Sequence, residues 1–85
     1  MTFDVTILLF GPVREIAGVD RIRLNVRSQM TSAEIIQQIV KKHPSLKQIS
    51  SNCVLAVGQQ YRHHDENLYL DTSTEIALIP PISGG

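Results

Sequence analysis

The fold is decided by residues 31–42, which read TSAEIIQQIVKK. Thr31 and Glu34 have the spacing of a capping box, in which each side chain satisfies a free amide at the start of a helix. The apolar residues that follow recur at helical spacing and so share one face: Ile35, Ile36, Ile39 and Val40. Pro44 disfavours helical backbone at His43. These signals predict one amphipathic helix that begins after Thr31 and ends before Pro44.

Two stretches before this helix alternate in the way that strands do. Residues 3–10 place apolar side chains at every second position, and their other side also turns apolar at Leu8 and Phe10. Residues 20–26 alternate between aliphatic and mostly arginine side chains, which is typical of a half-exposed strand. Residues 11–18, bounded by glycines, predict a loop that holds one or two helical turns. We therefore expect a hairpin around this longer loop.

The segments after the helix are short. Residues 45–52 are polar and predict one short helical turn, and residues 68–70 form a brief apolar patch. The remaining predictions are a strand at 53–57, a turn at 58–59, a short partner strand at 60–62, a polar loop at 63–67, a turn at 71–74 and a last strand at 75–79. No internal repeat is visible in this order.

The composition narrows the class of protein. The chain has 85 residues, enough for one small domain, and its eight Lys and Arg are balanced by eight Asp and Glu. A nucleic-acid reader needs a general basic face, so we expect no nucleic-acid partner. Cys53 is the single cysteine, which excludes an internal disulfide, and its apolar neighbours predict a buried, unreactive thiol. No segment approaches transmembrane length and no secretory signal is visible, so we expect a cytosolic protein without a membrane partner.

The order of the elements predicts an α+β fold. One amphipathic helix covers only one face of a sheet of this size. The first and last strands are the most apolar, so we place them side by side at the centre, and the helical crossover between them allows a parallel pairing. The result is a mixed sheet of four to five strands packed on one main helix, the ubiquitin-like β-grasp arrangement. We expect this domain to span residues 1–81, followed by a flexible C-terminal Gly-Gly tail at 82–85.

The face of the sheet that the helix leaves uncovered is predicted to be apolar. If Ile76 and Leu78 face the helix, alternation turns the side chains between and after them outward. The outward set would be Leu8, Phe10, Ala77 and Ile79, with Tyr61 as a further member. Exposed apolar patches of this kind mark interaction sites. The alternative is that the loop at 11–18 folds over them.

The end of the sequence is a candidate functional segment: Pro80, Pro81, Ile82, Ser83, Gly84 and Gly85. Pro80 and Pro81 lack backbone donors and fix φ, so they should end the sheet ladder and hold the exit extended. Gly84 and Gly85 have no Cβ and could enter a narrow channel. The alternative is a frayed terminus with no function.

Three stretches of the sequence match the motifs of one known family. Phe10–Gly18 has the form F-x-x-x-R-E-x-x-G, and Glu75–Gly85 reads EIALIPPISGG and is similar to E-V-A-x-x-P-P-V-x-G-G. Together with Leu55–Gln59, which is similar to a middle strand and turn, these stretches resemble the small subunit of molybdopterin synthase. The sequence departs from the family at 72–74, where Thr-Ser-Thr replaces a common Asp-Gly-Asp turn.

The resemblance implies a sulfur carrier. An activating enzyme related to ubiquitin-type adenylyltransferases would consume ATP to adenylate Gly85, and sulfur transfer would leave a thiocarboxylate there. The loaded tail would insert into the large catalytic subunit and give its sulfur to precursor Z (cyclic pyranopterin monophosphate). The implied assembly is a heterotetramer of two small and two large subunits. Catalysis would reside in the large subunit, and no cofactor would be bound by this chain.

Several readings remain open at this point. Arg14 and Glu15 either contact the activating enzyme or the large subunit, or form a solvated pair of little weight. The polar residues of 63–66 suggest a metal site, but adjacent histidines in extended chain point apart, which favours a solvated loop. The fold and tail also suit a sulfur carrier for thiamine synthesis or tRNA thiolation, or a ubiquitin-like modifier joined to target lysines through Gly85.

Overall fold

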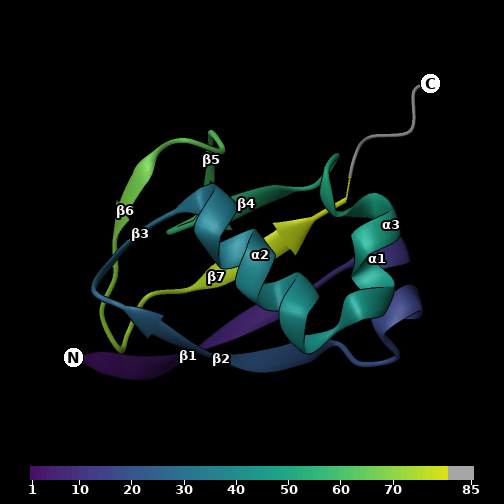
Figure 1. The fold of residues 1–85 in the computed structure, drawn as a ribbon, viewed down its shortest axis with the longest axis horizontal. Helices are drawn as coiled ribbons and strands as arrows, with labels where there is room; N and C mark the ends of the chain where they lie inside the picture. Colours follow the sequence, from purple (N-terminus) through teal and green to yellow (C-terminus); the bar gives the residue numbers. More distant parts are fainter. Residues whose placement is uncertain (81–85) are drawn as a thin grey trace.

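The computed structural model describes residues 1–80 of the chain (Figure 1). The elements in chain order are β1 (Thr2–Leu9), α1 (Gly11–Ala17), β2 (Arg21–Arg27), β3 (Gln29–Thr31), α2 (Ser32–Lys42), the 3-10 turn η1 (Pro44–Leu46), α3 (Lys47–Ser50), β4 (Val54–Val57), β5 (Gln60–Arg62), β6 (Asn67–Tyr69) and β7 (Ile76–Ile79). The predicted tail residues Pro81, Ile82, Ser83, Gly84 and Gly85 lie outside the described residues. The domain boundary at residue 81 therefore stays a prediction.

The main sheet has five strands in the order β2-β1-β7-β4-β5. β1 and β7 run parallel at its centre, with Leu8 opposite Ala77, and the other neighbours are antiparallel. In Figure 1, α2 lies across one face of this sheet. The predicted mixed sheet, with its first and last strands side by side under one main helix, is confirmed.

The main helix α2 begins and ends where the sequence predicts. Thr31 Oγ1 accepts from the Glu34 amide at 3.1 Å, and the Glu34 carboxylate accepts from the Thr31 amide at 2.8 Å. The amides of Ser32 and Ala33 donate to backbone carbonyls of the loop before β6, at 3.2 and 2.8 Å. The first turn therefore has its free donors satisfied from two directions. The helix ends at Lys42, two residues before Pro44.

The core lies between α2 and the sheet. The apolar face of the helix is buried there, as predicted, and so are alternate residues of every long strand. Fully enclosed side chains include Ile7, Leu9, Ile35, Ile39, Leu46, Cys53, Leu55, Ile76 and Leu78. The Cys53 thiol donates to the Ile49 carbonyl at 3.3 Å, and burial raises its pKa. The predicted packing role of Cys53 is confirmed.

The helical turns that the sequence predicts within residues 11–18 are present as the seven-residue helix α1. Gly11 and Gly18 bound it with φ of 55° and 78°, a left-handed conformation that glycine adopts without strain. Val13 is fully buried at the end of the core, whereas Phe10 just before the helix stays 48% exposed. α1 therefore packs into the core and does not cover the apolar face, which decides against the alternative of a covering loop.

Two features were not predicted. β3 and β6 form a separate two-stranded antiparallel sheet, in which Met30 lies opposite Leu68 and both are buried. Leu68 and Tyr69 of the predicted apolar patch at 68–70 therefore belong to this sheet, and Leu70 follows it. Residues 44–50 form two short helical elements, η1 and α3, where one turn was expected. No helix within the described residues is long and apolar enough to cross a membrane.

Candidate functional site: the uncovered sheet face and the exit of β7

One row of side chains runs across the uncovered face of the main sheet. The register places Leu8 opposite Ala77, Ala77 opposite Ala56, and Ala56 opposite Tyr61. Opposite residues of neighbouring strands share a face, so these four side chains from β1, β7, β4 and β5 point the same way. Their neighbours Ile76, Leu78 and Leu55 point into the core and are buried.

The middle of this row is hollow because its two central members are alanines. A cavity opens there, with larger side chains around it; its lining is Leu8, Phe10, Ala56, Gln59, Glu75, Ile76 and Ala77. An apolar cavity rimmed by polar groups suits the insertion of an apolar side chain from another protein. We call this cavity, together with Tyr61 and Ile79, the docking face.

The exit of β7 lies beside the start of α1. A Cβ placed on Gly11 would lie 3.5 Å from Cγ of Pro80, so the proline ring packs closely over this glycine. Ile79, just before it, pairs with Val54 and is half-buried. The last described residue is therefore held in place at the end of a central strand, next to Phe10.

The β4–β5 hairpin presents Tyr61. Its two-residue turn, Gly58 and Gln59, has φ of 60° and 66°, which matches the right-handed twist of the strands. The Arg62 guanidinium then donates to the Val57 carbonyl at 3.1 Å and to the Glu66 carboxylate at 2.8 Å. The hydrogen bond from Arg62 holds the pKa of Glu66 below its usual value. The hairpin is thus fixed on its covered side, while Tyr61 is 74% exposed.

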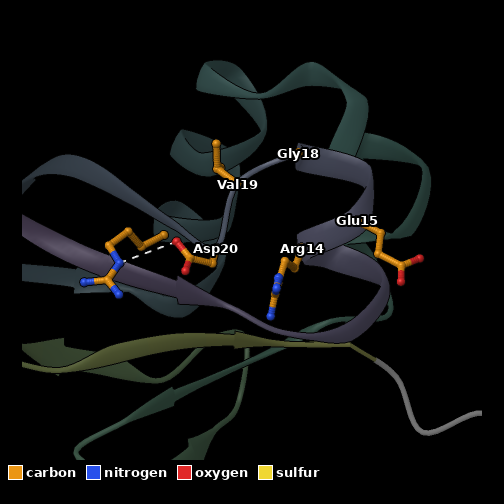
Figure 2. Close-up of a pocket in the computed structure, with 6 residues that line it drawn as sticks. Arg14, Glu15, Gly18, Val19 and Asp20 are labelled. Carbon is orange, nitrogen blue, oxygen red and sulfur yellow. Dashed lines mark ion pairs between the residues drawn. The ribbon is translucent and has the colours of Figure 1, made fainter.

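Arg14 and Glu15 lie on α1 and do not pair with each other. Figure 2 shows their side chains leaving the helix in different directions, beside a shallow pocket that Gly18, Val19 and Asp20 complete with Arg21. Both side chains are exposed. Within residues 1–80 they form no ion pair with each other, and the alternative that both are merely solvated stays open. Their predicted role in partner binding stays a prediction.

Polar residues of 63–66 form hydrogen bonds within the domain. The His64 ring lies 3.0 Å from the Cys53 carbonyl through Nε2, and Glu66 binds Arg62. The His63 amide donates to the Glu66 carboxylate at 3.3 Å. Within residues 1–80, no three potential metal-ligating side chains gather.

The structure brings several of the predicted partner-binding residues together. Phe10, Tyr61 and Ile79 lie on the docking face, and Pro80 lies at the β7 exit, whereas Arg14 and Glu15 lie beside the other pocket. Sequence reasoning missed Ala56 and Gln59. The alternation within 53–57 could have placed Ala56 outward, but Gln59 reaches the rim only through the turn geometry.

Comparison with known proteins places this geometry in a family. A family model described as the ThiS family matches residues 7–85. A molybdopterin synthase sulfur carrier subunit from Dictyostelium discoideum is 34% identical, and the similarity covers 100% of both chains. One from Homo sapiens is 35% identical, over 96% of this chain and 94% of its own length.

Two solved structures share the fold. SAMP1 from Haloferax volcanii has a TM-score of 0.78 at 22% identity, covering 98% of this chain and 100% of its own. The other, described as a complex of subunits 1 and 2 of molybdopterin-converting factor from Helicobacter pylori, has a TM-score of 0.64 at 19% identity, over 98% and 100%. At these identities the likeness establishes the β-grasp fold. The family match and the relatives above 30% identity carry the classification: the chain belongs to the ThiS family and, within it, to the molybdopterin synthase sulfur carrier subunits.

Proposed function

We propose that this chain carries sulfur for molybdopterin synthase on the carboxylate of Gly85. A free carboxylate is a poor electrophile, so an activating enzyme of the ubiquitin-type adenylyltransferase class joins it to AMP at the expense of ATP. A sulfur nucleophile then displaces AMP and leaves a thiocarboxylate. This species is nucleophilic and needs only delivery, because docking places it against its acceptor.

The partner that receives the sulfur is the large catalytic subunit, and the acceptor is precursor Z. The assembly is a heterotetramer of two small and two large subunits, located in the cytosol. The tail from Pro80 to Gly85 enters the large subunit, while this chain contributes no general acid or base and binds no cofactor. The solved Helicobacter pylori complex, which pairs subunits 1 and 2 of a molybdopterin-converting factor, supports a partner of this kind.

The observation that carries the proposal is the position of the β7 exit. β7 is a central strand, so its end is held by neighbours on both sides. Pro80 packs over Gly11, beside Phe10 and the docking face. A partner that binds the docking face is therefore next to the point where the sequence continues to Gly85. Arg14 and Glu15 extend this contact region along α1.

The test is the intact mass of the protein after co-expression with an activating enzyme. We expect the mass gain of one oxygen-to-sulfur exchange, located at Gly85 by fragmentation. A variant that lacks Gly85 should fold normally and stay unmodified, and it should not support molybdoenzyme activity. Sulfur exchange at another residue, or full activity without Gly85, would contradict the proposal.

The alternative functions use the same tail. A carrier for thiamine synthesis or tRNA thiolation would restore those pathways in a deletion strain, and a modifier would form conjugates with lysines of cellular proteins. The identity to molybdopterin synthase carriers and the Arg14-Glu15 element favour the first proposal. Conjugates in lysate that depend on Gly85, without loss of molybdoenzyme activity in the deletion strain, would favour the modifier.

A further inference from the structure

The outer edge of β2 is not paired with another strand within residues 1–80. β2 is an edge strand of the five-stranded sheet. The Leu9 amide donates to the Asp20 carbonyl at 2.9 Å, and the register that sets Leu8 opposite Arg21, continued by one residue, sets Leu9 opposite Asp20. Hydrogen-bonded pairs alternate along an antiparallel ladder, so Ile22, Leu24 and Val26 bond to β1. The residues between them turn their N–H and C=O groups away from the sheet: Arg21, Arg23 and Asn25.

Two side-chain contacts agree with this assignment. Lys42, in the last turn of α2, donates its ammonium to the Arg23 carbonyl. The Arg27 amide points the same way and meets the sulfur of Met30 at 3.4 Å. Lys42 therefore occupies the acceptor that an added strand would use. A lysine at a sheet edge discourages unselective pairing of strands.

The same edge is basic on both of its sides. Arg21 and Arg23 project on the uncovered face of the sheet, and Lys42 reaches the edge from the helix side. Within residues 1–80, the Arg23 side chain donates only to the neutral Thr6 hydroxyl, at 2.9 Å. The Arg21 side chain is 66% exposed and forms a surface ion pair with Asp20 at 3.5 Å. Arg21, Arg23 and Lys42 thus lie along one strand edge, where Asp20 offsets one of the three positive charges.

We propose that the outer edge of β2 binds an extended acidic segment of a partner protein by strand addition. The segment's amide takes the Arg23 carbonyl in place of Lys42, and the released ammonium meets a carboxylate on the segment. Carboxylates on its other side meet Arg21 and Arg23. Main-chain bonds supply affinity in such complexes, and alternate side chains supply selectivity.

A second copy of this chain is disfavoured as the occupant. Pairing two β2 edges would place Arg21 and Arg23 of one copy close to the same arginines of the other. Like charges opposite one another destabilise a strand pair. An acidic segment would be attracted by these arginines, so its binding is favoured over the pairing of two copies of this chain.

The site is independent of the proposed function. β1 lies between β2 and β7, so the edge and the β7 exit are on different parts of the sheet. The tail can therefore be engaged elsewhere while the edge is occupied, although Arg21 also lines the pocket beside Arg14 and Glu15. A partner bound at the β2 edge would stay attached to this protein without blocking its tail.

The test is a titration of isotope-labelled protein with a short, blocked peptide of alternating aspartate and valine, followed by NMR. We expect shifts and slower exchange at the amides of Arg21, Arg23 and Asn25. The same peptide with N-methyl groups on the amides that face β2 should bind about tenfold more weakly, because it loses main-chain hydrogen bonds. Equal affinity for the two peptides would overturn strand addition and leave only charge attraction.

Charge variants test whether the arginines of the edge attract the carboxylates of the segment. Arg23→Glu should weaken peptide binding about tenfold, since it reverses a charge beside the segment. Lys47→Glu makes the same change of net charge on exposed α3 and should leave affinity unchanged. An equal loss in both variants, shifts confined to the docking face, or slower exchange at the edge in protein alone at high concentration would each overturn the proposal. Unchanged spectra of core amides verify that the variants are folded.

Discussion

At the scale of single residues, Glu34 makes the stability of the first turn of α2 depend on pH. The amide of Thr31 donates to its carboxylate at 2.8 Å, and this bond, aided by the Thr31 hydroxyl and Arg27, lowers the pKa of Glu34 from its usual value. A carboxyl whose pKa is lower in the folded state stabilises the fold above its unfolded pKa. That stabilisation is lost as the pH falls through the folded pKa.

We therefore expect Glu34→Gln to reduce the free energy of unfolding at neutral pH and to make no difference in acid. Urea unfolding at a series of pH values below and above 4.5 measures both quantities. Glu75→Gln is the control, because Glu75 is exposed and its side chain makes no hydrogen bond within residues 1–80. Glu66 and Asp71 also have lowered pKa values, so the free energy of unfolding keeps some pH dependence in the wild type and in both variants. A constant difference between Glu34→Gln and wild type at all pH values would contradict the linkage.

At the scale of elements, β2 should show two classes of amide. Ile22, Leu24 and Val26 donate to β1, whereas Arg21, Arg23 and Asn25 face the open edge. Hydrogen exchange of the free protein should therefore alternate along the strand, slow at the first set and fast at the second. Uniform protection would mean that another element or another copy covers this edge.

The elements also separate what could be predicted from the sequence from what could not. α2 was predicted correctly because its cap, its periodicity and Pro44 are all local signals. The pairing of β1 with β7 followed from their apolar character. β3 and β6 were missed because three-residue strands are too short to show a period, and their pairing joins segments far apart in the chain. The outward residues of the docking face were predictable from the alternation within each strand. Its hollow was not, because it depends on Ala56 of β4 lying opposite Ala77 of the neighbouring strand β7.

At the scale of the whole molecule, the two faces of the main sheet have different roles, one in stability and one in binding. The helix-covered face holds the buried core, and the uncovered face holds the docking face beside the β7 exit. Apart from Ile76, which is buried, the side chains of the docking face point away from the core. Substitutions of the outward-facing residues there should therefore affect binding far more than folding.

Phe10 tests this separation. It lies on the rim of the hollow and is 48% exposed, so Phe10→Ala should reduce the free energy of unfolding by only about 1 kcal/mol. If Phe10 anchors the large subunit, the same change should weaken that complex by about tenfold or more, as aromatic anchors at interface centres do. Tyr69→Ala is the matched control, because Tyr69 is 78% exposed on β6, outside the main sheet. Titration calorimetry with the large subunit measures both affinities, and thermal unfolding measures both stabilities. Unchanged affinity in Phe10→Ala, or an equal loss in Tyr69→Ala, would show that the partner binds through another surface.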